Sequence, residues 1–417
     1  MPTVRPFQAI RPVPELAYKV AALPYDVMSS EEAWQEAAQN PYSFLHIDKA
    51  EIDLDRSVPL YDDRVYEKAR DNLNRMISEG VFLQDEKPCL YIYRQVMDGR
   101  TQTGIVGCAS IDDYRNNVIK RHELTRADKE QDRIRHVDTC NANTGPIFLT
   151  YQGQPDVKEI AEKIIAACKP VFDFTSDDGV SHAVWLVEDP AVIDSICGSL
   201  KQAKAFYIAD GHHRCASAVQ VGMMRRAESP DFDGSEEFNY FLSVIFPAEQ
   251  LYIMDYNRLV RDLNGYSVES FLEKVSESFI ISPYTGDEPL RPEKKHTFGM
   301  YLNGKWMMLE AKNGTYDCND PVAQLDVSIL QSNLLSPILG IGDPRTDERI
   351  DFVGGIRGLQ YLADRVDSGE MRVAFSMFPT TIEDLIAVSD CGAIMPPKST
   401  WFEPKLRSGL FIHKLSD

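Results

Sequence analysis

The sequence has 417 residues and a formal net charge of −20 at pH 7, with 43% hydrophobic and 26% charged residues. This composition is typical of a soluble globular protein, and the length allows two domains with large buried cores. A surface with this excess of acidic groups repels polyanions, which excludes nucleic-acid or anionic-membrane binding as the main role. A small anionic ligand is still compatible with the sequence, because a local basic pocket outweighs distant acidic charge.

Two features indicate a cytoplasmic protein. The first ten residues contain no apolar core of signal-peptide length, and no stretch approaches the ~18 apolar residues that span a bilayer. The eight cysteines are scattered and form no C-x-x-C pair, which is typical of reduced thiols rather than of disulfides or a cysteine zinc site. We therefore expect no membrane-spanning segment.

The first half of the chain alternates helix and strand signals. Four prolines between Pro6 and Pro24 exclude a long helix there. Apolar residues at helical spacing predict a helix between Tyr61 and Gly80, and the Asp98-Gly99 turn between two apolar runs predicts a β-hairpin. Further along, the pattern predicts helices over 156–168 and 190–200, and strands over 146–151 and on both sides of the turn at 176–179.

A basic segment runs from Arg115 to His136 and holds seven Lys/Arg against four acids. Thr125 with Asp128 resembles a capping pair, which predicts a helix from Arg126. One face of that helix is either an ordinary solvated, salt-bridged surface or part of an anion site. The residues that share this face are Lys129, Asp132, Arg133 and His136.

A new series of helix and strand signals begins after Pro247. We therefore expect an N-terminal α/β domain over 1–247 and a C-terminal α+β domain over 248–417. The fold class we expect is mixed α/β or α+β, with mixed sheets and flanking helices. The second half predicts helices over 268–279, 322–335 and 354–367, and a hairpin around Asn303-Gly304. The loop at 395–409 is either a basic surface loop or an oxyanion contact that returns to a site in the first domain.

The central motif is Asp210-Gly211-His212-His213-Arg214. The residues before it predict a strand and those after it predict a helix, so the motif occupies a strand–turn–helix junction. Backbone N–H groups without an intrahelical partner gather at such a helix start, where they favour phosphate. His212 belongs to the buried stripe of the helix and is expected to orient the turn. His213 and Arg214 rotate away from that stripe and are expected to contact a ligand.

Several well-defined metal-binding, nucleotide-binding and catalytic motifs are missing from the sequence. His122-Glu123 is followed by Arg126, so there is no H-E-x-x-H zinc helix. The neighbouring His212 and His213 lie ~100° apart on a helix, which is a poor spacing for one metal from that helix alone. The sequence contains no P-loop, no G-x-G-x-x-G fingerprint and no G-x-S-x-G nucleophile elbow. A nucleotide site in this chain must therefore have another form.

Two resemblances add to this interpretation. The Asp210–Arg214 motif resembles the signature of the ParB/sulfiredoxin-like superfamily, and most closely its free serine kinases; sulfiredoxins carry a cysteine where this chain has His212. Four segments, one of which contains this motif, resemble a family catalogued as a domain of unknown function, DUF 1015, which implies no particular activity. Those segments are Leu23–Val27, Arg121–Thr125, Ala209–Arg214 and Met395–Thr400.

Together these observations favour a kinase-like phosphotransferase that moves phosphate between ATP or ADP and a small hydroxylated metabolite, for which the resemblance suggests free serine. The alternatives are a non-catalytic regulatory protein that binds a nucleotide or phosphometabolite, and a phosphoester hydrolase. The expected catalytic residues are Asp210, His213 and Glu123, with Asp210 also a candidate Mg²⁺ ligand. The expected phosphate- or nucleotide-binding residues are Gly211, His212, Arg214, Lys129, Arg133, Lys398, Ser399, Thr400 and Lys405.

Overall fold

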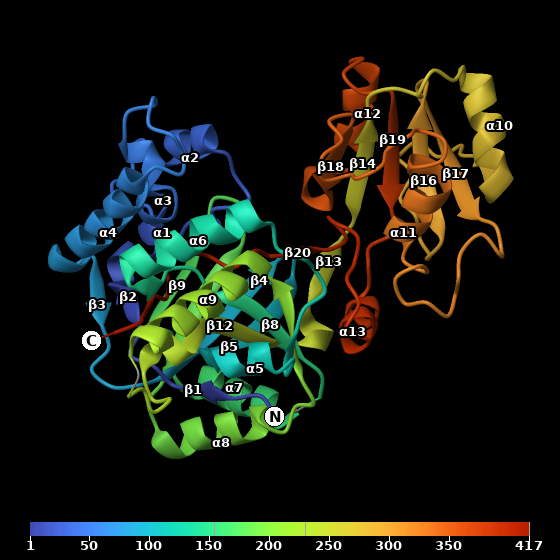
Figure 1. The fold of residues 1–417 in the computed structure, drawn as a ribbon. Helices are drawn as coiled ribbons and strands as arrows, with labels where there is room; N and C mark the ends of the chain where they lie inside the picture. Colours follow the sequence, from blue (N-terminus) through green and yellow to red (C-terminus); the bar gives the residue numbers. More distant parts are fainter. Residues whose placement is uncertain (154, 230, 417) are drawn as a thin grey trace. The chain divides into compact units, whose positions relative to one another are not determined.

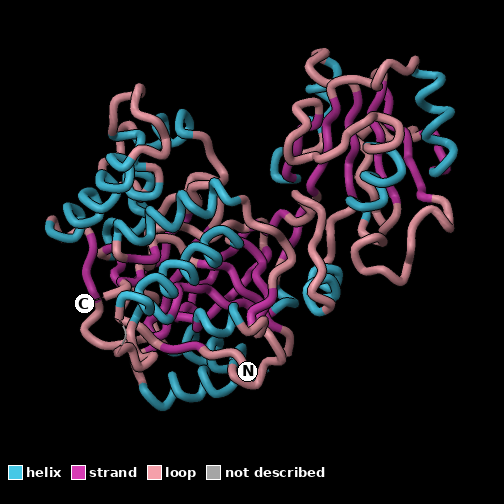
Figure 2. The backbone as a smooth tube through the Cα atoms, in the orientation of Figure 1, coloured by secondary structure: helices cyan, strands magenta, loops and turns pink. Residues whose placement is uncertain are grey.

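The computed structural model describes residues 1–153, 155–229 and 231–416, and the chain divides into two units (Figure 1). Unit 1 comprises Met1–Leu251 and Pro404–Asp417, and unit 2 comprises Tyr252–Glu403. The chain thus leaves unit 1 once and returns to it at its end. In each unit the strands form a central sheet with helices around it (Figure 2), which confirms the expected mixed fold class.

Unit 1 is built on a nine-stranded mixed sheet. Strand pairs β8–β12 and β6–β11 are parallel, and the other neighbours are antiparallel. In spatial order the strands are β6 (Ile119–Lys120), β11 (Phe206–Asp210), β8 (Ile147–Tyr151), β12 (Tyr240–Pro247), β5 (Arg100–Ser110), β4 (Leu90–Met97), β10 (Ser181–Val187) and β9 (Phe172–Thr175), with β1 (Val4–Arg5) paired to β5. The β4–β5 pair is the hairpin expected around Asp98-Gly99.

The side chains of β4 show how the sheet is covered on both faces. Leu90 and Ile92 belong to the apolar core that the sheet shares with its helices, while Tyr91 and Tyr93 pack against Phe411 of the C-terminal segment. This alternation follows from the two-residue period of a strand. The helices that contribute to the apolar core are α5 (Ile111–Arg115), α7 (Pro155–Ala167), α8 (Pro190–Leu200) and α9 (His212–Glu228).

A second core of unit 1 lies among the N-terminal helices. Long helix α4 contacts α6, and α6 in turn packs along α9 (Figure 1). The elements of this region are β2 (Ile10–Pro12), α1 (Ala17–Val20), α2 (Ser30–Ala37), α3 (Leu45–Asp48), α4 (Asp63–Ser78), β3 (Phe82–Gln84), α6 (Ala127–Cys140) and β7 (Ala142–Asn143), which pairs with β21 (His413–Lys414). Helices α6 and α9 therefore lie side by side, although 71 residues separate their ends.

Unit 2 contains a six-stranded antiparallel sheet. In spatial order its strands are β15 (Phe279–Pro283), β17 (Lys305–Ala311), β16 (Thr297–Leu302), β19 (Val373–Met377), β14 (Tyr256–Val260) and β18 (Ile350–Gly354). Its other elements are α10 (Val268–Ser278), α11 (Asp326–Leu330), α12 (Gln360–Asp367), α13 (Ile382–Asp390) and the pair of β13 (Tyr252–Met254) with β20 (Trp401–Glu403). The expected hairpin at Asn303-Gly304 is confirmed, and both turn residues have positive φ.

One predicted helix cap and two predicted helix starts were wrong. Helix α6 begins at Ala127, within one residue of the predicted start, but Thr125 does not cap it: Arg126 is the N-cap residue, and the Thr125 hydroxyl donates to Glu130 Oε2 at 2.5 Å. The helix expected from Val322 begins at Asp326, since Asp320 Oδ1 holds the preceding residues in a turn. The helix expected from Gly354 begins at Gln360, because Gly358 has φ +75° and interrupts it.

Across the described parts of the chain, no helix combines the length and the apolar character needed to cross a membrane.

Candidate functional site

The turn between β11 and α9 is stabilised by contacts among its own residues. Gly211 is the N-cap of α9 and has φ +88°, a left-handed conformation that side chains rarely adopt. Its amide N–H donates to Asp210 Oδ1 at 2.9 Å. A Cβ atom on Gly211 would lie 3.0 Å from Arg214 Nε, so the Arg214 guanidinium folds back over the turn. Glycine is therefore required for both the backbone conformation and the position of Arg214.

Lys405 reaches this turn from the C-terminal segment of unit 1. Its Nζ lies 3.1 Å from Asp210 Oδ2, and its backbone carbonyl accepts a hydrogen bond from Gln95 on β4. Burial opposes the ionisation of Asp210, but Lys405 and Arg214 outweigh it and hold the pKa of that carboxyl well below its ordinary value. The Asp210 side chain is nevertheless 28% exposed. An ionised carboxylate thus lies at the start of α9.

Arg214 is a half-buried cation with one donor that no described residue accepts. Its Nη1 donates to the Pro146 carbonyl at 2.5 Å, whereas its buried Nε has no hydrogen-bond partner among the described residues. Burial opposes the charge, but Asp26 and Asp210 outweigh it and raise the pKa of the guanidinium. Arg214 is therefore charged, and it keeps a donor for another group.

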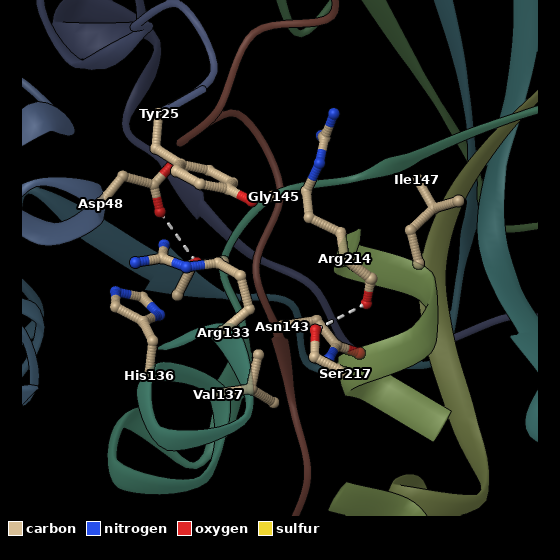
Figure 3. Close-up of a pocket in the computed structure, with 11 residues that line it drawn as sticks. Tyr25, Asp48, Arg133, His136, Val137, Asn143, Gly145, Ile147, Arg214 and Ser217 are labelled. Carbon is tan, nitrogen blue, oxygen red and sulfur yellow. Dashed lines mark hydrogen bonds between the residues drawn. The ribbon is translucent and has the colours of Figure 1, made fainter. Parts of the chain in front are cut away.

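Arg214 and Arg133 line one cavity of unit 1. The two side chains project from different helices, α9 and α6 (Figure 3). Arg133 pairs with Asp132 at 2.9 Å, and its guanidinium lies 4.1 Å from the centre of the Tyr25 ring. The lining residues are Tyr25, Asp48, Arg133, His136, Val137, Asn143, Thr144, Gly145, Ile147, Arg214 and Ser217.

One wall of this cavity consists of residues that sequence reasoning did not assign to a site. Asp48 accepts a hydrogen bond from Thr144 Oγ1 at 2.9 Å, and His136 Nε2 lies 3.0 Å from the Ile47 carbonyl. Burial and Arg133 lower the pKa of His136. Burial and the nearby Asp26 carboxylate raise the pKa of Tyr25 above its ordinary value. Two of them had a signal in the sequence, since Tyr25 belongs to the Leu23–Val27 motif and His136 to the predicted helix face that Arg133 shares.

The two histidines of the motif have different surroundings. His213 is half-buried, and its Nε2 accepts the amide N–H of Arg126 at 3.0 Å, at the start of α6. His212 is buried beside His122, with the two rings at right angles and their centres 4.5 Å apart. Burial lowers the pKa of His122 to about 4 and that of His212 well below its ordinary value. Both rings are therefore neutral at pH 7.

The remaining predicted residues divide between the two units. In unit 1, Lys129 does not line the cavity; its Nζ instead lies 3.1 Å from the Tyr61 hydroxyl. In unit 2, Ser399 Oγ donates to the Pro396 carbonyl at 2.6 Å and the Lys398 carbonyl accepts from Arg258 at 2.9 Å, so this loop is ordered within its own unit. The residues that unit 1 gathers around the turn and its cavity are Asp210, Gly211, His212, His213, Arg214, Arg133 and Lys405.

Fold and site together define a protein with a mixed α/β unit, in which a cavity lined by two arginines lies at a strand–turn–helix junction. A family model described as "Protein of unknown function (DUF1015)" matches residues 4–328, and the chain belongs to that family. The family predicted from the sequence motifs is thereby confirmed. No curated protein matches the sequence significantly.

Several solved structures are similar to the chain at low identity. A conserved hypothetical protein from Pyrococcus furiosus is 14% identical, with a TM-score of 0.35, and the match covers 74% of this chain and 94% of that one. A free serine kinase in complex with AMP is 13% identical, with a TM-score of 0.37, covering 74% and 91%. SbnI from Staphylococcus aureus, with a C-terminal truncation, is 12% identical, with a TM-score of 0.35, covering 72% and 82%. TM-scores at this level do not establish a shared fold, and the ParB/sulfiredoxin-like assignment of the turn stays a prediction.

Proposed function

We propose that unit 1 is a small-molecule phosphotransferase of the kinase type. It would bind the phosphates of ATP or ADP at the Asp210–Arg214 turn and transfer phosphate to a hydroxyl of a small metabolite, with free serine as the first to test. The supporting observation is the state of Arg214, which is half-buried and charged, has an Nε donor without a partner among the described residues, and lines a cavity of a strongly acidic protein. A bound oxyanion would satisfy both the charge and the donor.

The start of α9 adds further donors to this proposal. The first N–H groups of a helix lack intrahelical partners, and here they belong to His212, His213 and Arg214. Helix N-termini of this kind favour phosphate. Arg133 supplies a second guanidinium on the same cavity. Because phosphoryl transfer depends chiefly on positioning and charge neutralisation, this set of groups suits it.

The roles of the three catalytic candidates follow from their contacts. Asp210 is ionised and neutralised by Lys405, which makes it a weak base, so we assign it to turn positioning and to Mg²⁺. His213 accepts the Arg126 amide at Nε2, so its neutral ring carries the proton on Nδ1 and can donate to a phosphate. Glu123, whose side chain is 38% exposed, is the candidate for general base or for ligand of a divalent cation.

Nucleotide binding by Arg214 variants tests the proposal. Arg214→Ala should weaken ATP affinity by about tenfold to a hundredfold in calorimetry, since one or two charge-assisted hydrogen bonds are lost. The matched control is Arg225→Ala, because Arg225 lies on the same helix but pairs with Asp138 outside the cavity. Equal affinities in wild type and both variants would place any nucleotide elsewhere, and a wild type that binds no nucleotide would overturn the proposal.

Turnover separates the three functions. Phosphorus NMR of the protein with ATP, Mg²⁺ and a panel of small alcohols and hydroxy amino acids should show ADP together with a new phosphate ester. Free phosphate without an ester would indicate a hydrolase. Tight binding without consumption would indicate a regulatory nucleotide-binding protein, which the neutralisation of Asp210 by Lys405 also supports.

A further inference from the structure

Two chain segments that each lack a metal motif meet at one edge of the sheet in unit 1. Strand β6 runs parallel to β11, with Ile119 opposite Phe206 and Lys120 opposite Tyr207. Because the carboxyl ends of parallel neighbours meet at the same edge, the residues after β6 lie beside the residues after β11. This places His122 and Glu123 next to His212, the first residue of α9.

The side chains of these three residues converge. One potential ligand atom from each lies within 4.8 Å of the other two. His212 Nδ1 is 3.9 Å from Glu123 Oε2, and the His122 and His212 rings are perpendicular with centres 4.5 Å apart. Neither segment could have indicated this arrangement alone, since it combines an adjacent pair with a residue about 90 positions away.

We propose that His122, Glu123 and His212 bind one divalent transition-metal ion of the Zn²⁺ class, beside the Asp210–Arg214 turn. Two imidazoles and one carboxylate form a donor set that suits Zn²⁺ and disfavours Mg²⁺, which takes oxygen ligands. His122 and His212 are buried, at 1% and 6% exposure, and burial favours the neutral imidazole that coordinates metals. Three protein ligands leave a position for water or an anionic oxygen, and the half-exposed Glu123 gives access from solvent.

The surroundings of the two rings fit this role with a small adjustment. The His122 ring donates to the Ile208 carbonyl on β11, which fixes the ring and leaves its other nitrogen with the lone pair. His212 Nε2 accepts the His122 amide N–H at 3.5 Å, at the outer limit of a hydrogen bond. Coordination through Nδ1 requires the ring proton to move to Nε2, so this weak hydrogen bond is given up when the metal binds. The ligand atoms of a tetrahedral site are about 3.3 Å apart, so Glu123 must move inward by about 1 Å.

Calorimetric titration of the full chain with ZnCl₂, after dialysis against a chelator and without nucleotide, tests this site. We expect one ion per chain, and a loss of at least about tenfold in affinity for both Glu123→Gln and His212→Ala. MgCl₂ should give no comparable binding. The matched control is His46→Ala, because His46 pairs with Asp53 outside this cluster and its loss should leave Zn²⁺ affinity unchanged.

Co²⁺ gives a second readout, because its visible absorption reports the ligands directly. A band that appears on addition of one equivalent and is lost in His122→Ala supports the assignment. Glu123→Gln changes a half-exposed side chain, so this variant should fold. It therefore tests metal binding even if a variant of a buried histidine does not fold. No stoichiometric Zn²⁺ binding in the wild type, or equal affinity in Glu123→Gln, overturns the site. Both readouts are independent of nucleotide binding, so they stand apart from the proposed phosphotransferase.

Discussion

Lys405 Nζ lies 3.1 Å from Asp210 Oδ2, although 195 residues separate them in the sequence. Between these two residues the chain forms α9 and β12 of unit 1 and all of unit 2 before it returns to unit 1. The lysine side chain is only 10% exposed, and the pair joins the C-terminal segment to the start of α9. The charge state of the turn therefore depends on a segment that folds onto unit 1 from the far end of the chain.

Replacing Lys405 by Met should destabilise the protein, because it removes one of the two cations, Lys405 and Arg214, that stabilise the Asp210 carboxylate. We expect a loss of about 2 kcal/mol in the free energy of unfolding at pH 7, less than for a fully buried pair since Asp210 is partly exposed. The pKa of Asp210 is lower in the folded state than in the unfolded state. Ionised Asp210 therefore stabilises the folded state at pH values above its unfolded pKa, and this stabilisation is lost as the pH falls toward the folded pKa. The difference between wild type and variant should thus shrink from pH 7 toward pH 3. Urea unfolding across this range measures it, with Lys414→Met in the same segment as the control; a constant difference would contradict the explanation.

Gly211→Ala should damage both stability and ligand binding. Alanine at φ +88° costs about 1–2 kcal/mol, and its Cβ would lie 3.0 Å from Arg214 Nε and displace the guanidinium. We expect a lower melting temperature together with at least tenfold weaker ATP binding under the proposed function. Gly99→Ala is the matched control, because Gly99 has φ +76° with no atom within 4 Å of its Cβ. It should lower the melting temperature similarly and leave ATP binding unchanged; equal binding losses in both variants would contradict a specific role for Gly211.

The local part of the site was predictable from the sequence. The Asp-Gly pair after an apolar run predicts a turn, and the periodicity that follows predicts α9 with His212 on its buried side; the structure has both. The turn and the helix depend on residues that are close in sequence, so a short stretch of the sequence is enough to predict them.

The non-local part was not predictable in this way. Asp48 and Thr144 meet across 96 positions to form a wall of the cavity, and no periodicity relates them. Lys129 and Arg133 share a helix face in the sequence pattern, yet only Arg133 lines the cavity, because Lys129 is directed toward Tyr61. Tertiary packing decides which residue of a charged helix face points into the protein. Helical spacing alone cannot predict that choice.

Gly222→Ala should destabilise unit 1 even though alanine is the better helix former. Gly222 lies in the middle of α9, where its Cβ would be 2.4 Å from the Phe238 carbonyl oxygen and 2.8 Å from Ile111 Cδ1. The clash with backbone outweighs the gain of about 1 kcal/mol in helix propensity. Gly198 in α8 has nothing within 4 Å, so Gly198→Ala should instead stabilise by about 0.5–1 kcal/mol. We expect Gly222→Ala to lower the melting temperature and Gly198→Ala to raise it. A higher melting temperature in both variants would show that α9 does not pack as closely against Phe238 and Ile111 as these distances indicate.

In unit 2, Asp326 should make stability depend on pH near neutrality. Its Oδ1 accepts the His296 amide at 2.8 Å, and its buried Oδ2 has no hydrogen-bond partner among the described residues. Burial raises the pKa of this carboxyl from 3.8 to about 7. The folded state therefore favours the protonated form, and this contribution is complete below pH 4 and is lost as the pH rises through about 7.

Asp326→Asn keeps an acceptor for the His296 amide and removes the charge that forms at high pH. At pH 8 we expect the variant to be more stable than the wild type by up to about 4 kcal/mol, and at pH 5 we expect the difference to be small. Hydrogen–deuterium exchange of unit 2 peptides, corrected for the intrinsic pH dependence of exchange, measures the opening free energy at both values. Asp364→Asn is the control, because Asp364 is exposed on α12 and should leave the pH dependence unchanged. An equal benefit of Asp326→Asn at pH 5 and pH 8 would mean that ionisation of Asp326 is not the cause.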